Sequence, residues 1–115
     1  MKTRLVVRAL IERDGLALVN ETKSGPRLLG GRVDKGETLK DALVRELLEE
    51  VGCRATVSQV IGVSERRRKS LREITFIFRV VLFGEPVSQE KQIRLGWVSR
   101  PEVCAWTNTI KFQAA

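Results

Sequence analysis

The sequence predicts a mixed α/β fold, and three features of the chain support this prediction. Strand-like runs come first, one clear amphipathic helix follows, and further strand-like runs and a short helix complete the order. The 115 residues suit one compact domain. A hydrophobic content of 43% is enough to build a core, which argues against a disordered chain. We therefore expect a single α/β domain over residues 1–115.

The first half of the chain is predicted to hold two strands and a long loop. The strands are expected at residues 3–12 and 16–21, and Arg13-Asp14-Gly15 separates them. Asp-Gly is a strong hairpin signal, so we expect a tight turn there. Residues 22–37 contain four glycines and one proline, and we expect them to form a loop.

The clearest helix is predicted from Thr38 to Val51. Thr38 is a favourable N-cap, and Asp41 three residues later comes close to a capping box. Gly52 follows directly, and glycine is common just past the C-terminus of a helix.

The second half of the chain is predicted to consist mainly of strands. The run 71–83 is rich in β-branched and aromatic residues, which suits a strand covered on both faces. Residues 66–70, RRRKS, are expected to form an exposed basic turn. The remaining elements are strands at 54–65, with a bulge at Gly62, and at 92–98, followed by a short helix at 101–106.

Charge and residue types narrow the class of function. The formal net charge is 21 − 14 = +7, which favours polyanionic partners such as nucleotides or nucleic acid. The chain has no histidine, which excludes histidine triads and histidine zinc sites. Cys53 and Cys104 lie in apolar surroundings and are expected to fill the core. No apolar run is long enough to span a membrane, so we expect a cytoplasmic protein with no membrane partner.

Three glutamates crowd one stripe of the predicted helix. At roughly 100° per residue, Glu46, Glu49 and Glu50 fall within an arc of about 100°. Like charges four residues apart and negative charge at a helix C-terminus both destabilise a helix. Arg45 can neutralise one carboxylate, and divalent cations can neutralise all three; oxygen ligands without histidine favour Mg²⁺, with Mn²⁺ as a substitute. The alternative is that these glutamates form a solvated surface.

The spacing around this stripe favours the metal-binding alternative. From Gly31 to Cys53 the chain meets every fixed position of the pattern G-x5-E-x7-R-E-U-x-E-E-x-G-U, where U is apolar. This segment resembles the Nudix box of the Nudix hydrolase family. Many members carry proline two residues before the first glycine of the box, where this chain has Leu29.

The resemblance implies a fold, a reaction and a set of metal ligands. The implied fold is an α/β/α sandwich with a mixed β-sheet and the Nudix loop–helix. The implied reaction is Mg²⁺-dependent hydrolysis of a pyrophosphate bond in a nucleoside diphosphate derivative. Glu49 and Glu50 would coordinate the metal, and Gly31 would add its backbone carbonyl. Glu46 would be a third ligand or the general base, and the resemblance does not choose between these roles.

Other residues receive supporting roles from the same resemblance. Glu37 and Arg45 would form an ion pair that braces the loop against the helix. Some members recruit a further catalytic glutamate from a later loop, and Glu90 is the first candidate here, with Glu85 second. The alternative for both is an ordinary loop charge.

Cations near the box are candidates for binding the substrate phosphates. Arg27, Arg32 and Lys35 flank the glycine-rich loop, although each alone is a weak signal. The run 66–69 can meet an extended polyanion, and its alternative is a solvated turn.

The substrate is less well determined than the reaction. Signatures of members that cleave ADP-ribose, dinucleoside polyphosphates, NADH or coenzyme A are absent from the sequence. A nucleoside triphosphate, a modified nucleotide, a nucleotide sugar or the 5′ end of an RNA remains. A non-catalytic module that binds nucleotides or RNA is a further alternative, and a homodimer is compatible with the short chain. The candidates for base stacking are Trp97, Trp106 and Phe112, because Phe76 and Phe78 are expected in the core.

Overall fold

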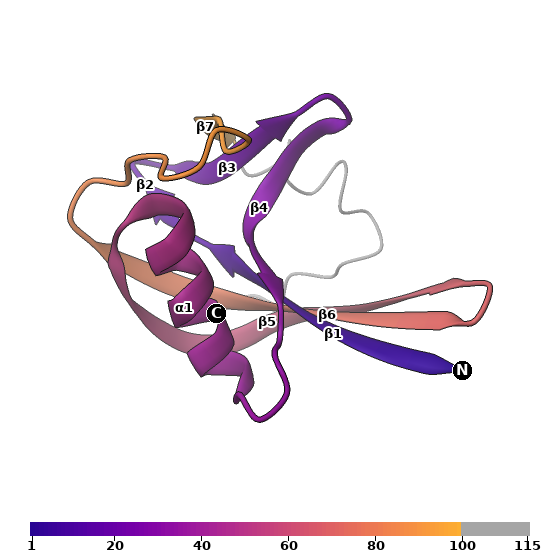
Figure 1. Ribbon diagram of the computed structural model, residues 1–115. Helices are drawn as coiled ribbons and strands as arrows, with labels where there is room; N and C mark the ends of the chain where they lie inside the picture. The colour runs from indigo at the N-terminus through magenta and orange to yellow at the C-terminus, as the bar shows by residue number, and fades with distance from the viewer. Residues whose placement is uncertain (100–115) are drawn as a thin grey trace.

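The computed structural model describes residues 1–99, which hold one helix and a mixed β-sheet (Figure 1). The helix, α1 (Leu39–Val51), lies against one face of the sheet. The strands are β1 (Lys2–Leu10), β2 (Glu12–Arg13), β3 (Leu16–Thr22), β4 (Gly25–Arg32), β5 (Arg54–Arg68), β6 (Leu71–Phe83) and β7 (Leu95–Ser99).

The sheet is mixed because one of its pairings is parallel. The strand order is β2-β3-β4-β1-β6-β5, and β7 pairs with β3. β1 and β6 run parallel along nine paired positions, whereas the other pairs are antiparallel. The α/β fold predicted from the sequence is confirmed. The short helix expected at 101–106, which would belong to a second helical layer, lies outside the described residues.

The prediction of a loop over residues 22–37 is wrong for its central part, which is β4. Gly25–Leu28 pairs with β3, and Leu29–Arg32 pairs with β1, so one strand joins the two parts of the sheet. Leu28 and Leu29 are both buried, one on each face. Pairing with β1, which is distant in sequence, and with its hairpin neighbour β3 therefore overrides the local turn signals of glycine and proline.

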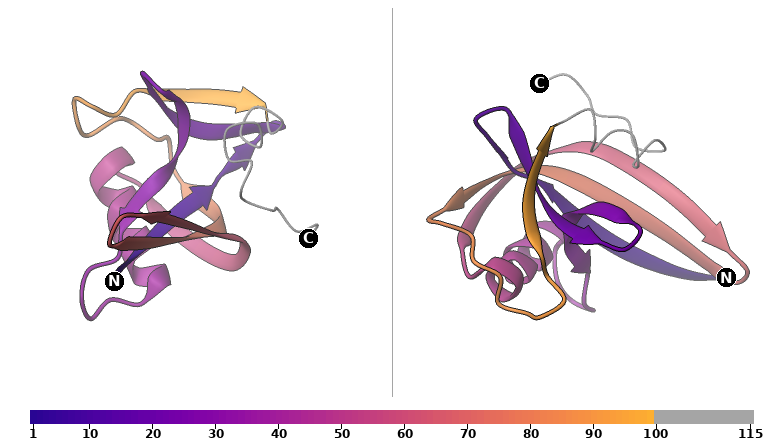
Figure 2. Two further views of the ribbon diagram at one scale, coloured as in Figure 1. Left: turned by 90° about the vertical axis from the view of Figure 1, so that its right-hand side faces the viewer. Right: turned by 90° about the horizontal axis from the view of Figure 1, so that it is seen from above.

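The prediction of an exposed turn over residues 66–70 is also wrong for the three arginines of this segment. Arg66, Arg67 and Arg68 end β5, and only Lys69 and Ser70 form the turn. The backbone N–H of Lys2 donates to the carbonyl of Ser70 at 2.8 Å, so the start of β1 lies beside this turn. The long β5–β6 hairpin projects beyond α1 together with the chain start (Figure 2, right).

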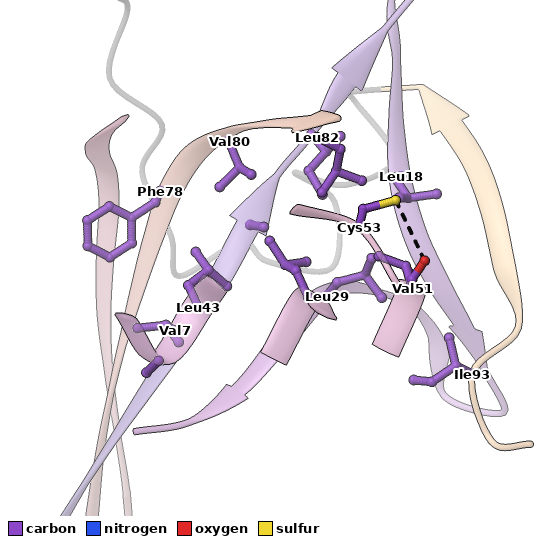
Figure 3. Close-up of a cluster of buried hydrophobic side chains, with 14 residues drawn as sticks. Val7, Leu18, Leu29, Leu43, Val51, Cys53, Phe78, Val80, Leu82 and Ile93 are labelled. Atoms are coloured by element: carbon purple, nitrogen blue, oxygen red, sulfur yellow. Dashed lines mark hydrogen bonds between the residues drawn. The ribbon is translucent and has the colours of Figure 1, made fainter. Parts of the chain in front are cut away.

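Two apolar clusters lie on the two faces of the sheet. The larger cluster packs beneath α1 and includes Val7, Leu43, Leu47 and Phe78 (Figure 3). It also contains Cys53, whose thiol donates to the carbonyl of Val51 at 3.6 Å, so its expected role as core filler is confirmed. Cys104 lies outside the described residues. The smaller cluster lies on the opposite face and consists of Leu10, Ala17, Val19, Leu28, Ile61 and Ile77.

Several local predictions are confirmed with small differences. The turn at Asp14-Gly15 has positive φ at both residues, which is the geometry of a tight hairpin. The register of β5 against β6 shifts between Val57 and Gly62, in agreement with a bulge. β6 is not covered on both faces throughout, because Val81 and Phe83 are exposed at its end. Within residues 1–99, no helix is long and apolar enough to cross a bilayer.

Candidate active site

Helix α1 is held firmly at both ends. Its N-cap is Thr38, whose hydroxyl oxygen accepts the N–H of Asp41 at 3.1 Å. Gly52 ends the helix in the left-handed conformation with φ 70°, and its N–H donates to Leu48 at 3.0 Å. Because Leu43 and Leu47 are fully buried against the sheet, the stripe of Glu46, Glu49 and Glu50 is kept beside β4.

Arg45 binds the carboxylates of the helix and of the preceding loop. Its guanidinium donates to Glu37 at 2.7 and 2.9 Å, to Glu46 at 3.0 Å and to Glu49 at 3.3 Å. A further ion pair joins it to Asp34 at 3.4 Å. These partners raise the pKa of Arg45, Glu37 foremost, so the guanidinium is a permanent positive charge here.

The loop before α1 closes around Glu37. The Glu37 carboxylate accepts the N–H of Asp34 at 2.9 Å, and the N–H of Glu37 donates to the carbonyl of Asp34 at 3.0 Å. The guanidinium of Arg45 also donates a hydrogen bond, from Nη2, to the carbonyl of Arg32 at 3.1 Å. Hydrogen bonds from Arg45 and Asp34 lower the pKa of Glu37. The structure thus brings Glu37 and Arg45 together as a tie between loop and helix.

Glu50 is the one charged residue among residues 1–99 that is buried, with 9% of its surface exposed. Its carboxylate accepts the N–H of Gly30 at 3.0 Å. Burial, and then the negative charge of Glu46, raises its pKa to about 7. Burial likewise raises the pKa of Glu46, against the opposing effect of Arg45. A single backbone hydrogen bond does not offset the cost of burying an ionised Glu50, so this position favours an added positive charge.

Gly30 and Gly31 make room for this arrangement. Gly30 has φ 143°, and a Cβ there would lie 1.9 Å from the carbonyl oxygen of Val7. At Gly31 a Cβ would lie 2.6 Å from the carboxylate of Glu46. The first glycine is required by the close approach of β1, and the second by the glutamate that lies across it.

The loop between β6 and β7 brings Glu90 toward the end of α1. The N–H of Gln89 donates to the carbonyl of Glu50 at 2.9 Å. The charge of Glu90 contributes to the raised pKa of Glu50, and Gln92 donates a hydrogen bond to the Glu90 carboxylate. Glu85 lies elsewhere: its side chain is 88% exposed and pairs with Arg13 at 3.3 Å. Of the two candidates in this loop, the fold therefore brings Glu90 and not Glu85 to the glutamate stripe.

The comparison with protein families decides which family builds this site. The family model described as NUDIX domain matches residues 2–114, almost the whole chain. The chain belongs to the Nudix family. The resemblance seen in residues 31–53 therefore extends well beyond the Nudix box.

Two named relatives are longer than the chain. The CTP pyrophosphohydrolase of Escherichia coli (strain K12) is 39% identical, over 57% of this chain and 53% of that protein. The ADP-ribose pyrophosphatase of Methanocaldococcus jannaschii is 34% identical, over 67% and 51% respectively. The chain thus spans about half the length of these curated relatives. The solution structure of the E. coli ORF135 protein has a TM-score of 0.80 at 30% identity, covering 91% of this chain and 79% of that one.

The carboxylate oxygens of the Nudix helix are ligands of the type that hard divalent cations prefer. Within residues 1–99, no three acidic or cysteine side chains converge as a ready-made metal site. Arg45 explains this, because it holds Glu46 and Glu49 while Glu50 faces Gly30. Glu49 is 51% exposed, so it can leave Arg45 by an inexpensive rotamer change. The donor set consists of oxygens and includes a buried carboxylate with a raised pKa, which suits Mg²⁺ or a similar ion.

The other candidate residues divide between two surfaces. Arg32 and Lys35 line a pocket of about 500 Å³ beside the box loop, and Arg27 lines a second pocket on the sheet. Of the aromatic candidates, Trp97 is 37% exposed and its ring lies 6.0 Å from the guanidinium of Arg13. Trp106 and Phe112 lie outside the described residues.

The sequence interpretation missed two residues that contact or influence the acidic stripe. Asp34 is one, because it adds a carboxylate to Arg45. Arg8 is the other. It lies on β1 and donates a hydrogen bond to the carbonyl of Leu28 at 3.2 Å. The negative charges of Glu50 and Glu46 act on its guanidinium. Burial lowers the pKa of Arg8. A charged residue between Val7 and Ala9 in an apolar strand was the available signal.

Proposed function

We propose that the chain hydrolyses a pyrophosphate bond in a nucleoside diphosphate derivative, with Mg²⁺ as the cofactor. The observation that carries this proposal is the buried Glu50 carboxylate, placed beside Glu46 and Glu49 by a complete Nudix box. The family match supports the reaction class, and so do the two relatives, whose names specify a CTP pyrophosphohydrolase and an ADP-ribose pyrophosphatase. Those names differ in the nucleotide they specify, so they do not select one substrate.

Four groups of the Nudix box would hold the cation. They are the carboxylates of Glu46, Glu49 and Glu50 and the backbone carbonyl of Gly31. When bound, the cation would neutralise charge on the diphosphate and lower the pKa of a bound water. Pyrophosphate hydrolysis requires such charge neutralisation and an activated water more than a covalent nucleophile.

The remaining groups of the site position these ligands and move a proton. Arg45 orients Glu46 and Glu49 through its fork of N–H donors, and Gly30 holds Glu50 through its N–H. Glu46 acts as a third ligand or accepts the proton of the attacking water. Glu90 is the alternative proton acceptor, because its loop is tied to the end of α1. A raised pKa, as burial gives Glu46, suits a general base that works near neutral pH.

The test is a substrate panel assayed with Mg²⁺ and with a chelator. The panel contains nucleoside triphosphates, oxidised nucleoside triphosphates, nucleotide sugars, ADP-ribose and a 5′-triphosphorylated oligoribonucleotide. We expect cation-dependent release of phosphate, pyrophosphate or a nucleoside monophosphate from at least one class. Binding of nucleotides without any turnover would contradict the proposal and support a non-catalytic module instead.

A further inference from the structure

A pocket lined by arginines lies on the sheet face opposite the Nudix helix. Its volume is about 210 Å³, below the roughly 300–1,000 Å³ typical for a drug-sized ligand, so it suits one chemical group better than a whole nucleotide. We call it the arginine pocket. Its lining residues are Arg4, Arg27, Arg66, Arg68, Leu71 and Glu73.

The strand register explains why the lining residues of β1, β5 and β6 share one face. Arg4, Glu73 and Arg66 are directly paired across β1, β6 and β5. Leu71 pairs with Lys2 on one side and with Arg68 on the other, and each of these residues lies two positions from its counterpart in the first row. Because residues two apart in a strand point to the same face, both rows project into the same space. The intervening Arg67 and Arg72 pair with each other and point to the opposite face.

The charge of the arginine pocket is strongly unbalanced. Within residues 1–99, Glu73 is the only carboxylate that makes an ion pair with any of its arginines, at 3.5 Å from Arg4. Arg66 and Arg68 are exposed, and Arg27 adds a further charge from β4. Guanidinium groups that converge without matching carboxylates repel one another, and a phosphate removes this repulsion while accepting paired N–H donors.

A line of charge connects the arginine pocket with the glutamates of the Nudix box. Arg8 lies on the same face of β1 as Arg4, four residues further along the strand. The charges of Glu50 and Glu46, and those of Arg27 and Glu73, all act on its guanidinium. Four residues of strand span about 13 Å. A nucleotide with a further phosphate on its sugar is long enough to contact residues this far apart along β1, whereas a lone diphosphate is not.

A second basic surface continues from the arginine pocket to the box loop. Arg4 and Leu71 line both the arginine pocket and the 500 Å³ pocket beside the loop. The larger pocket is also lined by the cations Lys2, Arg32 and Lys35 and by the carboxylates Asp34 and Glu37, so cations outnumber carboxylates there. The two pockets therefore form adjoining parts of one positively charged surface that leads from the sheet to the Nudix box.

We infer that the arginine pocket binds a phosphate group of the substrate other than the pyrophosphate that is cleaved. This inference rests on the proposed function, because it places the cleaved pyrophosphate at the glutamates. It narrows the substrate class to nucleotides that carry an additional phosphate, either as a 3′-phosphate monoester or as the first phosphodiester of an oligonucleotide. The base is then held less specifically than the two anionic groups.

The test compares three substrates that share one base. They are a ribonucleoside 5′-triphosphate, the same compound with a 3′-phosphate, and a 5′-triphosphorylated dinucleotide. We expect kcat/KM to be about tenfold higher for at least one of the two substrates with an additional phosphate. Preference for the monoester assigns the pocket to mononucleotides, and preference for the diester assigns it to oligonucleotide ends.

Two double variants separate the arginine pocket from general charge. Arg66→Gln/Arg68→Gln removes two pocket arginines, and Arg67→Gln/Arg72→Gln removes the same charge from the opposite face of the hairpin. The first should abolish the preference and leave kcat/KM on the plain triphosphate within about twofold, whereas the second should retain the preference. Absence of a preference in the wild type, equal effects of both variants, or an equal loss on all three substrates would each overturn the inference.

A binding measurement keeps this inference distinct from the proposed function. If no substrate is hydrolysed, the proposed function fails, and the arginine pocket is then tested with nucleoside 3′,5′-bisphosphates against 5′-monophosphates. Titration calorimetry without divalent cation should give tighter, more salt-sensitive binding of the bisphosphate to the wild type and to Arg67→Gln/Arg72→Gln. Equal affinities for the two ligands would overturn the inference independently of catalysis.

Discussion

Two charged regions on opposite faces of the sheet are built in opposite ways. Beneath and before α1, five carboxylates gather around the single guanidinium of Arg45 or lie beside it. At the β5–β6 hairpin, four arginines line a pocket that holds one carboxylate, Glu73. The first region has surplus negative charge and the second surplus positive charge. Each surplus raises the energy of the empty protein, and each is relieved by a ligand of opposite sign.

The regions also differ in rigidity. The acidic region is enclosed by a capped helix, by Gly30 and by hydrogen bonds that tie the loop to Arg45. The basic region includes the end of a projecting hairpin (Figure 1), where Arg66 and Arg68 are exposed. Chemistry requires fixed groups, whereas recognition of a phosphate tolerates mobile ones. This difference agrees with the proposals that bond cleavage takes place at the first region and that the second selects the substrate.

Removing charge from the acidic stripe is the change with the largest expected effect. Glu49→Gln or Glu50→Gln should lower kcat by roughly a hundredfold or more, because each removes a proposed cation ligand. The measurement is initial rate on the best substrate of the panel at saturating Mg²⁺. Glu65→Gln, an exposed change on the hairpin, serves as the matched control and should retain activity. Full activity in either stripe variant would show that the ligands are wrongly assigned.

The two adjacent glycines separate a structural requirement from a functional one. Gly30→Ala should destabilise the protein by about 3 kcal/mol, because the new Cβ meets the backbone of Val7 in a left-handed conformation. Gly31→Ala should cost much less stability, because it meets the flexible end of Glu46. Its activity should nevertheless fall about tenfold as that carboxylate is displaced. Denaturant unfolding and rate measurements on both variants test this, and equal unfolding midpoints would contradict it.

Replacing Arg45 by lysine tests whether its guanidinium holds the loop before α1 against the helix. The ammonium keeps the charge but cannot contact Glu37, Glu46 and Glu49 together through a planar fork. We expect a loss of about tenfold in kcat with a decrease of about 1–3 kcal/mol in the free energy of unfolding. Lys40→Arg on the same helix is the control. A variant as stable and active as the wild type would remove Arg45 from any positioning role.

The smallest expected effect concerns pH and the unliganded protein. Because the pKa of Glu50 is raised to about 7 in the folded state, its contribution to stability is fully present below about pH 4.5 and is lost as pH rises through 7. In chelator, the wild type should therefore lose about 1–2 kcal/mol relative to Glu50→Gln between pH 5 and pH 8.5. Unfolding curves at both pH values measure this difference. Parallel pH dependence of the two proteins would contradict the raised pKa.

Local signals predicted the elements that depend on local chemistry. The helix was predicted with both caps, because Thr38 and Gly52 satisfy its ends through bonds to residues within four positions. The hairpin at Asp14-Gly15 follows in the same way from the conformations those residues adopt. The local signals do not predict β4, because it is stabilised by pairing with β1, which is remote in sequence, and with β3. The local signals of Arg66–Arg68 indicate a turn, but pairing with β6 makes these residues part of a strand.

The sequence by itself determined the family resemblance, the capped helix and the identity of the acidic residues on its stripe. Their spacing follows from helix geometry, which does not depend on the rest of the fold. Only the tertiary structure decided that Glu50 is buried against Gly30, that Arg45 also binds Asp34, and that charges of both regions act on Arg8. It alone brought Arg4, Arg27, Arg66 and Arg68 from three strands into one pocket. Burial and the meeting of distant charges depend on strand pairing across the whole sheet, and no short stretch of sequence encodes that pairing.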